Sequence, residues 1–218
     1  MKKTVVYIDG FNLFYRALKG TAYKWLDLHA LCVAVLPKDC EIVAIKYYTA
    51  RVSGKIDANS PRDQQAYLNA LSSIDCLTPY FGSFQVTEKI SFLATPLTFQ
   101  PASVTPAHPV PRFAKVVKTE EKGSDVNLGV HLVRDAFVGA FEQAAILTND
   151  TDLVEPIRIV TSEAKLPVIL LTPVNKPAHD LSKLASGVRH VKPYIGTCQF
   201  PDPVVRGDGK VIAKPPGW

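Results

Sequence analysis

Short apolar runs alternate along this chain with stretches whose apolar residues recur at helical spacing. Residues 4–8 (TVVYI) form a continuous, β-branched run, which is typical of a central parallel strand buried on both faces. Comparable runs at 41–50 and 144–148 predict further strands, and helical patterns such as 61–74 and 124–137 separate them. Strands and helices that alternate at these lengths predict an α/β fold with a mostly parallel sheet.

The pattern predicts one main domain over residues 1–195. It is interrupted at about 82–112, an irregular excursion in which five prolines fall within sixteen residues, namely Pro96, Pro101, Pro106, Pro109 and Pro111. Residues 196–218 are rich in turn formers and are expected to form a tail packed on the body. The tail ends in Trp218, an aromatic residue that we expect to dock on the body or on a partner.

Composition narrows the class of protein only moderately. The chain has 218 residues, 47% of them hydrophobic, and a net charge of +5, which permits a polyanionic partner. Its four cysteines lack zinc-site spacing, and the first apolar stretch stops at Asp9, too early for a signal peptide. We therefore expect a cytoplasmic protein. The sequence has no GxGxxG, Walker or GxSxG motif, so nothing in it supports an NAD- or ATP-dependent enzyme.

Four carboxylates stand where predicted strands give way to helices: Asp9, Asp125, Asp150 and Asp152. Each of them alone is compatible with an ordinary helix cap or first-turn acid. As a set they are expected to converge at the carboxyl edge of the sheet, where like charges repel unless a cation lies among them. Hard cations such as Mg²⁺ or Mn²⁺ prefer carboxylate oxygens. The set therefore predicts a metal site that activates water for phosphodiester hydrolysis.

Two basic residues are candidates for binding a phosphate-containing substrate. Arg51 follows the strand at 41–50 and is expected to border the acidic pocket. Lys122 lies next to the acidic cluster in sequence, where it would orient or neutralise the scissile phosphate. The remaining lysines and arginines are mostly expected to be solvated surface residues.

Three blocks of this sequence resemble the NYN domain family of PIN-like nucleases. They are Asp9-Gly10-Phe11-Asn12, the block 122–126 (KGSDV) and the block 148–153 (TNDTDL), in which Thr148, Asn149 and Leu153 depart from the commoner Ser-Gly-Asp-x-Asp-Phe form. The resemblance covers roughly residues 3–195. It implies a Rossmann-like, PIN-like three-layer sandwich with a metal-dependent ribonuclease site. By motif match, Asp9, Asp125, Asp150 and Asp152 would be catalytic metal ligands, and Asn12 would help hold the substrate pocket.

The predicted function is therefore that of an Mg²⁺- or Mn²⁺-dependent (endo)ribonuclease whose partner is single-stranded or structured RNA. The alternative is a non-catalytic module that binds RNA or a metal for regulation. A phosphatase that forms an aspartyl phosphate is disfavoured, because Phe11 stands where such an enzyme needs a second aspartate. The sequence leaves the oligomeric state open, with a homodimer among the alternatives.

Overall fold

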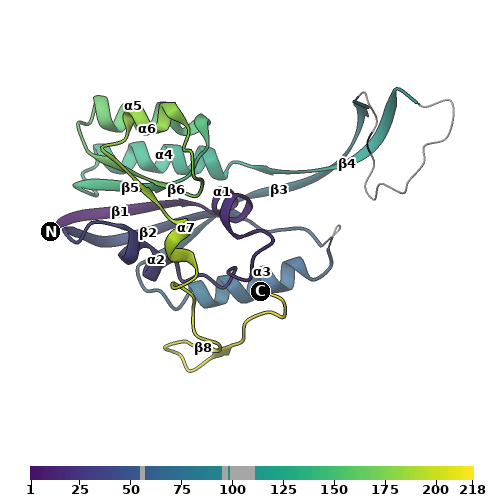
Figure 1. The fold of residues 1–218 in the computed structure, drawn as a ribbon, viewed down its shortest axis with the longest axis horizontal. Helices are drawn as coiled ribbons and strands as arrows, with labels where there is room; N and C mark the ends of the chain where they lie inside the picture. The colour runs from purple at the N-terminus through teal and green to yellow at the C-terminus, as the bar shows by residue number, and fades with distance from the viewer. Residues whose placement is uncertain (55–56, 95–97, 99–110) are drawn as a thin grey trace.

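A seven-stranded sheet in the order β4-β3-β2-β1-β5-β6-β7 forms the centre of the molecule (Figure 1). The computed structural model describes residues 1–54, 57–94, 98 and 111–218. Neighbouring strands are parallel except for the antiparallel pair β3 and β4. The strands are β1 (Lys2–Asp9), β2 (Cys40–Ala50), β3 (Leu77–Phe92), β4 (Phe113–Lys122), β5 (Gln143–Leu147), β6 (Val168–Thr172) and β7 (Gly187–His190).

Helices cover both faces of this sheet. Figure 1 shows α4, α5 and α6 together on one side and α2, α3 and α7 on the other. The helical segments are α1 (Gly10–Leu13), the π-helix η1 (Phe14–Leu18), α2 (Leu28–Val35), α3 (Ser60–Leu71), α4 (Ser124–Phe137), the 3-10 turn η2 (Thr151–Leu153), α5 (Val154–Ser162), α6 (His179–Leu184) and α7 (Lys192–Ile195). The predicted α/β fold with a mostly parallel central sheet is confirmed in this three-layer arrangement.

Alternating side chains of the central strands supply two separate hydrophobic cores. In β1, Val6 and Ile8 face the core shared with α2 and α3, whereas Val5 and Tyr7 face the core shared with α4 and α5. All four side chains are at most 3% exposed. A strand buried on both faces must be apolar throughout, which is why residues 4–8 form an unbroken apolar run.

A buried carboxylate fixes α4 on its face of the sheet. Asp135, 2% exposed, accepts a hydrogen bond from the hydroxyl of Tyr7 at 2.6 Å and pairs with the ammonium of Lys46. Burial, reinforced by this bond, raises the pKa of Tyr7 far above its ordinary value, so the tyrosine remains a donor. Asp135 therefore joins α4 to both β1 and β2.

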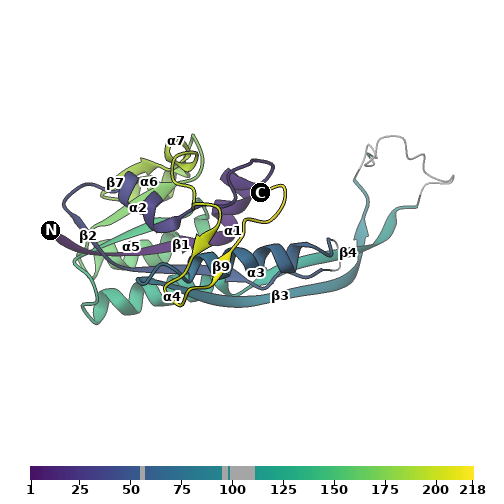
Figure 2. The ribbon, with the colours of Figure 1, turned by 90° about the horizontal axis from the view of Figure 1, so that it is seen from below.

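The ribbon formed by β3 and β4 corrects part of the predicted irregular excursion. Residues 83–92 pair in regular antiparallel register with 113–122, and the rings of Phe92 and Phe113 meet edge to face at 5.3 Å. Figure 2 shows the ribbon reaching well beyond the body. The pairing partner lies far along the chain, so the local pattern did not reveal it. Of the prolines named above, only Pro111 lies within the described residues.

The segment after α7 returns along the α3 side of the sheet. It contains the short hairpin of β8 (Val204–Val205) and β9 (Val211–Ile212). Figure 1 shows its end, in yellow, beside α3, and the ring of Trp218 lies 5.7 Å from that of Tyr67 in this helix. Among the described residues, no helix is both long and apolar enough to cross a bilayer.

The turn after β1 requires glycine, which yields a first prediction. A Cβ atom on Gly10 would lie 2.7 Å from the backbone oxygen of Tyr48 and equally close to the ring of Tyr47. We expect Gly10→Ala to lower the free energy of unfolding by about 1–3 kcal/mol, the usual cost of overpacking. Gly187→Ala is the control, because a Cβ there meets nothing within 4 Å. Urea denaturation of both variants tests this, and an unchanged Gly10→Ala midpoint would contradict it.

Candidate functional site

The strand order reverses between β1 and β5 at the carboxyl edge of the sheet, and we call the region between these two strand ends the crevice. The chain leaves β1 toward β2 on one side, whereas β5 leads on to β6 on the other. Open α/β sheets bind ligands at such a switch point. The residues that follow β1 and β5 therefore define the first candidate site.

Asp9 is the central residue of this crevice and is only 8% exposed. One carboxylate oxygen accepts a hydrogen bond from the backbone N–H of Asn12 at 2.9 Å and thereby caps α1. The other accepts a hydrogen bond from the hydroxyl of Thr148 at 3.1 Å. The backbone N–H of Asp150 donates in turn to the same hydroxyl at 3.1 Å. Asp9 thus ties the end of β1 to the turn after β5.

Asn12 and Asn149 extend this hydrogen-bonded frame. The side-chain oxygen of Asn12 accepts from the backbone N–H of Asn149 at 3.0 Å. The side-chain oxygen of Asn149 accepts from the backbone N–H of Ala178, just before α6, at 2.8 Å. Three chain segments that are distant in sequence are held together in this way at the crevice.

Burial controls the protonation of Asp9. Desolvation raises its pKa from 3.8 to about 6, with smaller upward contributions from the charges of Asp150 and Glu121. The hydrogen bonds from Asn12 and Thr148 oppose this rise, because they stabilise the ionised form. The pKa of Asp9 therefore lies well above that of an exposed aspartate.

The structure does not gather all the predicted site residues in this crevice. Asp9, Asn12 and Asp150 share the frame described above, and Asp150 also accepts from the N–H of Asp152 at 3.1 Å. Asp125 lies in the first turn of α4 and accepts from the N–H of Val126. With Asp152 it borders a mostly apolar hollow of about 650 Å³ between α4 and α5.

The two predicted basic residues make contacts of their own. Arg51 is hydrogen-bonded to Gln65 and lies over the ring of Phe81, 4.8 Å from its centroid. Lys122 pairs with Glu120 at 3.2 Å on the ribbon. No contact of either residue with Asp9 or Asp150 is present among the described residues.

A second cavity opens beside the crevice, at the carboxyl ends of β1 and β2. Its volume is about 510 Å³, and Gly10, Thr49 and the first turns of α3 form part of its wall. Six aromatic side chains line it: Phe11, Phe14, Tyr15, Tyr47, Tyr67 and Trp218. Lys19 and Lys24 line it as well. A cavity of this size that combines aromatic surface with polar and charged side chains has the dimensions of a small-molecule site.

Sequence reasoning missed most of this cavity. The aromatic residues of the stretch 11–15 are visible in the sequence, but their cavity forms only when β2, α3 and residues 216–218 are brought against them. Glu121, which contributes to the pKa of Asp9, was also missed. It accepts from the N–H of Ser124, the first residue of α4, at 2.9 Å. A glutamate three residues before a serine is the reverse of a capping box, so no motif marked this contact.

The raised pKa of Asp9 yields a second prediction. The pKa of Asp9 is higher in the folded state than in the unfolded state, so protonation of this carboxyl group favours folding. This stabilising contribution is complete at pH values below the unfolded-state pKa and is lost as the pH rises through about 6. At pH 7.5, Asp9→Asn should therefore unfold at a higher urea concentration than wild type. Its free energy of unfolding should be greater by on the order of 2–3 kcal/mol, since one pKa unit corresponds to about 1.4 kcal/mol. At pH 4 the two proteins should differ little.

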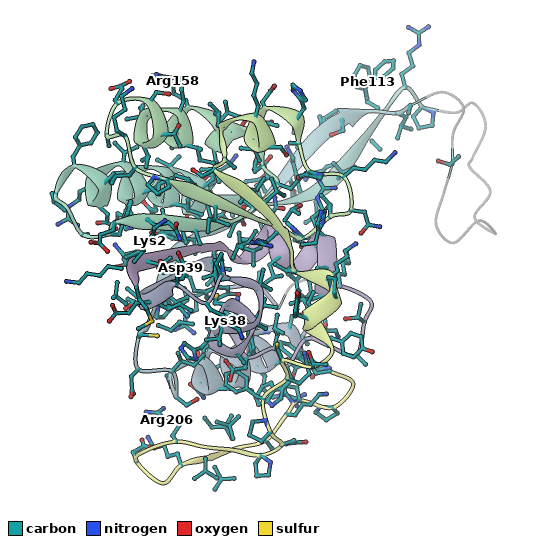
Figure 3. The ribbon with its side chains drawn as sticks, turned by 60° about the vertical axis from the view of Figure 1, so that its left-hand side comes forward. Lys2, Lys38, Asp39, Phe113, Arg158 and Arg206 are labelled. Carbon is teal, nitrogen blue, oxygen red and sulfur yellow. The ribbon has the colours of Figure 1, made fainter. Side chains whose placement is uncertain are left out.

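The control is Asp39→Asn. Asp39 is exposed and lies beyond the opposite end of β1, where Figure 3 labels it near Lys2. It should leave the stability at both pH values within about 0.5 kcal/mol of wild type. Equal stability of Asp9→Asn and wild type at pH 7.5 would contradict the assignment.

Comparison with known proteins finds similarity in both sequence and fold. The chain is 30% identical, over 249 aligned positions, to 6-hydroxy-3-succinoylpyridine 3-monooxygenase HspA of Pseudomonas putida, an alignment that covers 99% of this chain and 75% of that protein. A protein of unknown function from Vibrio parahaemolyticus has a similar fold, with a TM-score of 0.54, 14% identity, and coverage of 87% of this chain and 92% of that one. No family model matches the sequence.

These findings correct three predictions. The ribonuclease function and its non-catalytic alternative are wrong, because the curated relative is named as a monooxygenase. The Mg²⁺ or Mn²⁺ cofactor is wrong as well. In the part of the chain that the structure describes, no three His, Cys, Asp or Glu side chains are grouped so that they could hold a metal ion.

The acidic residues are instead used as hydrogen-bond acceptors for nearby N–H groups. Carboxylates engaged in this way hold turns and helix starts in place without a cation between them. The similarity to the relative extends over nearly the whole chain and three quarters of that protein. This chain belongs to the family of the 6-hydroxy-3-succinoylpyridine 3-monooxygenase HspA.

Proposed function

We propose that this protein is an oxidoreductase that adds one oxygen atom, as a hydroxyl group, to a hydroxylated heteroaromatic ring. The observation that carries the proposal is the near full-length similarity to a protein named as a monooxygenase of a hydroxylated pyridine. The aromatic cavity supports it, because it provides a place of suitable size and chemistry for such a ring.

The aromatic side chains suit a flat, partly polar ligand. The rings of Phe11 and Tyr15 are stacked with their centroids 6.3 Å apart, and Phe14 meets Tyr15 edge to face at 5.3 Å. Tyr47 and Tyr67 contribute further ring surface from β2 and α3. Aromatic side chains bind another ring through offset stacks and edge contacts. The substrate ring is therefore proposed to lie among these side chains.

The proposed reaction has a defined balance of atoms and electrons. One atom of dioxygen enters the ring as a hydroxyl group, and the other leaves as water. Two electrons and two protons are consumed, and we propose a reduced flavin or reduced nicotinamide as the electron donor, since these carriers supply such chemistry in enzymes.

The crevice between β1 and β5 does not fit the pyrophosphate of a flavin or nicotinamide dinucleotide. In dinucleotide-binding folds this position carries a glycine-rich turn and the start of a full helix. Here the carboxylate of Asp9 lies at the turn, with the charge of Asp150 acting on it, and Gly10 is the only glycine between β1 and the end of the helical segment 10–18. We therefore assign the ring substrate to the cavity and place no dinucleotide in the crevice.

We also propose that the fold is of the PIN-like type and the chain an NYN-type domain. The support is the arrangement of Asp9, Asn12 and Asp150 around the strand reversal, together with the three sequence blocks described above. This proposal concerns architecture and ancestry, and it carries no nuclease activity with it. RNA as a partner, a homodimer and a cytoplasmic location stay predictions.

Oxygen consumption tests the proposed function. With reduced nicotinamide and flavin supplied, we expect 6-hydroxy-3-succinoylpyridine or a related hydroxypyridine to stimulate oxygen uptake by the wild-type protein. Tyr15→Ala should lower kcat/KM by about tenfold, because an aromatic pair contributes about 0.5–1.5 kcal/mol beyond area burial.

The matched control is Tyr194→Ala, another partly exposed tyrosine, which lies in α7 away from the cavity lining. It should leave kcat/KM unchanged. An oxygen electrode gives the rates, and product analysis shows whether uptake is coupled to ring hydroxylation. Absence of substrate-dependent uptake with either donor would contradict the proposal.

A further inference from the structure

We propose that a second copy of this chain docks on the ribbon of β3 and β4, in a two-fold dimer in which the ribbon of each copy lies along α4 of the other. The inference stands apart from the proposed reaction. It gives the predicted homodimer a specific interface, and it assigns a role to the part of the fold that reaches beyond the body (Figure 2).

One face of the ribbon continues the sheet face that α4 covers. Tyr80 in β3 points toward this helix, where its ring meets the ring of His131 edge to face at 4.7 Å. Since side chains alternate along a strand, Ile90 and Phe92 lie on the same face as Tyr80. Figure 1 shows the ribbon running on past the helices of the body. The outer part of this sheet face is therefore open to a partner.

This face of the ribbon is apolar and exposed. The antiparallel register places Phe113 opposite Phe92 and Val117 opposite Glu88, on the same face. Ile90, Phe92, Phe113 and Val117 are each more than half exposed. The opposite face is mainly polar and includes Thr87, Lys89, Ser91 and Lys118. A two-stranded ribbon of this kind is only marginally stable in water until another element covers its apolar face.

The outer face of α4 offers the matching surface. Val126, Val130 and Phe137 form a row at helical spacing, and each is more than half exposed. The row lies opposite Leu128 and Leu132, which are buried against the sheet. The apolar hollow between α4 and α5 lies beside it. A helix with an apolar row is the element that normally covers the apolar face of a sheet.

The positions of the two surfaces within one copy allow a reciprocal exchange. The ribbon ends at Lys122 and α4 begins at Ser124, and the two run away from this turn in opposite directions (Figure 1). The apolar face of the ribbon and the exposed row of α4 both point away from the sheet on the same side. A two-fold axis near the turn therefore brings the ribbon of each copy against α4 of the other.

The size of the contact favours two reciprocal contacts over one. At about 3.4 Å per residue, the 10 residues of β4 make the ribbon about 34 Å long, and its two strands make it about 10 Å wide. Its face therefore covers about 340 Å², well below the roughly 800 Å² that each partner contributes to a stable interface. In the exchange each copy contributes its ribbon and the surface under its partner's ribbon, which together approach that area.

Charge also favours this arrangement of two copies. The hollow beside α4 carries two carboxylates, Asp125 and Asp152, against one cation, Arg134. Neither carboxylate forms an ion pair within the described part of the chain. The ribbon residues 83–92 and 113–122 contain four lysines and three glutamates, a net positive charge. Opposite net charges attract the ribbon to the α4 surface, whereas two ribbons of like charge repel each other.

Sedimentation-equilibrium centrifugation of the full chain over a range of concentrations tests the inference. Wild type should form a dimer and no larger species, because reciprocal contacts close the assembly. Val117→Ser on the ribbon and Val130→Asp on α4 should each raise the dimer dissociation constant at least tenfold. Each change removes a buried apolar side chain from both of the equivalent contacts in the dimer.

Each variant has a matched control. Val116 is the neighbour of Val117 on the opposite face of the ribbon, so Val116→Ser should leave the dissociation constant unchanged. Val33 in α2 is 59% exposed, as is Val130, so Val33→Asp should likewise have no effect. Circular dichroism checks that all four variants are folded, which is expected because the substituted side chains are exposed.

The outcomes distinguish the exchange from other contacts. Weaker dimers in both variants, with both controls at wild-type affinity, would support it. A wild type that is monomeric at every concentration, or that grows into larger assemblies, would overturn it. Weakening by Val117→Ser but not by Val130→Asp would show that two ribbons meet face to face, and equal weakening by a control would show that these faces are not the interface. Either result would also overturn the inference.

Discussion

The reversal of strand order between β1 and β5 is the constraint on which the rest of the structure depends. It places the ends of two buried parallel strands side by side and sends the chain away from them in opposite directions. The polar groups exposed at these ends need partners, and Asp9, Thr148 and Asn149 supply them across the gap. The close approach of β2 at Gly10 follows from the same geometry and brings the cavity next to the crevice.

Much of the fold follows from local sequence patterns. The unbroken apolar run of β1 and the helical patterns between the strands are set by burial on both faces of the sheet, and they predict the layered α/β architecture. The continuation of β3 beyond residue 82 could not be predicted in this way. It depends on pairing with β4 across the proline-rich stretch, and local periodicity does not encode such a distant partner.

The candidate site was harder to predict, because one residue pattern serves two purposes. An aspartate at the end of a strand is equally suited to ligating a cation and to accepting a hydrogen bond from the helix that follows. In this molecule Asp9, Asp125 and Asp150 each accept from an N–H within three residues. Spacing in sequence does not distinguish the two roles, whereas the grouping of the side chains in space does: among the described residues no three of them are placed to hold a metal ion. The cavity depends on contacts between residues near positions 15, 67 and 218, which no local motif brings together.

The central claim is that the cavity binds a heteroaromatic ring that is hydroxylated with an oxygen atom from dioxygen. The most direct measurement is mass spectrometry of the product formed from a hydroxypyridine under ¹⁸O₂, with a reduced nicotinamide or flavin as electron donor. The account predicts one ¹⁸O atom in the new ring hydroxyl group of each product molecule and none when the label is in water. Product without ¹⁸O, or product formed equally in the absence of dioxygen, would contradict it.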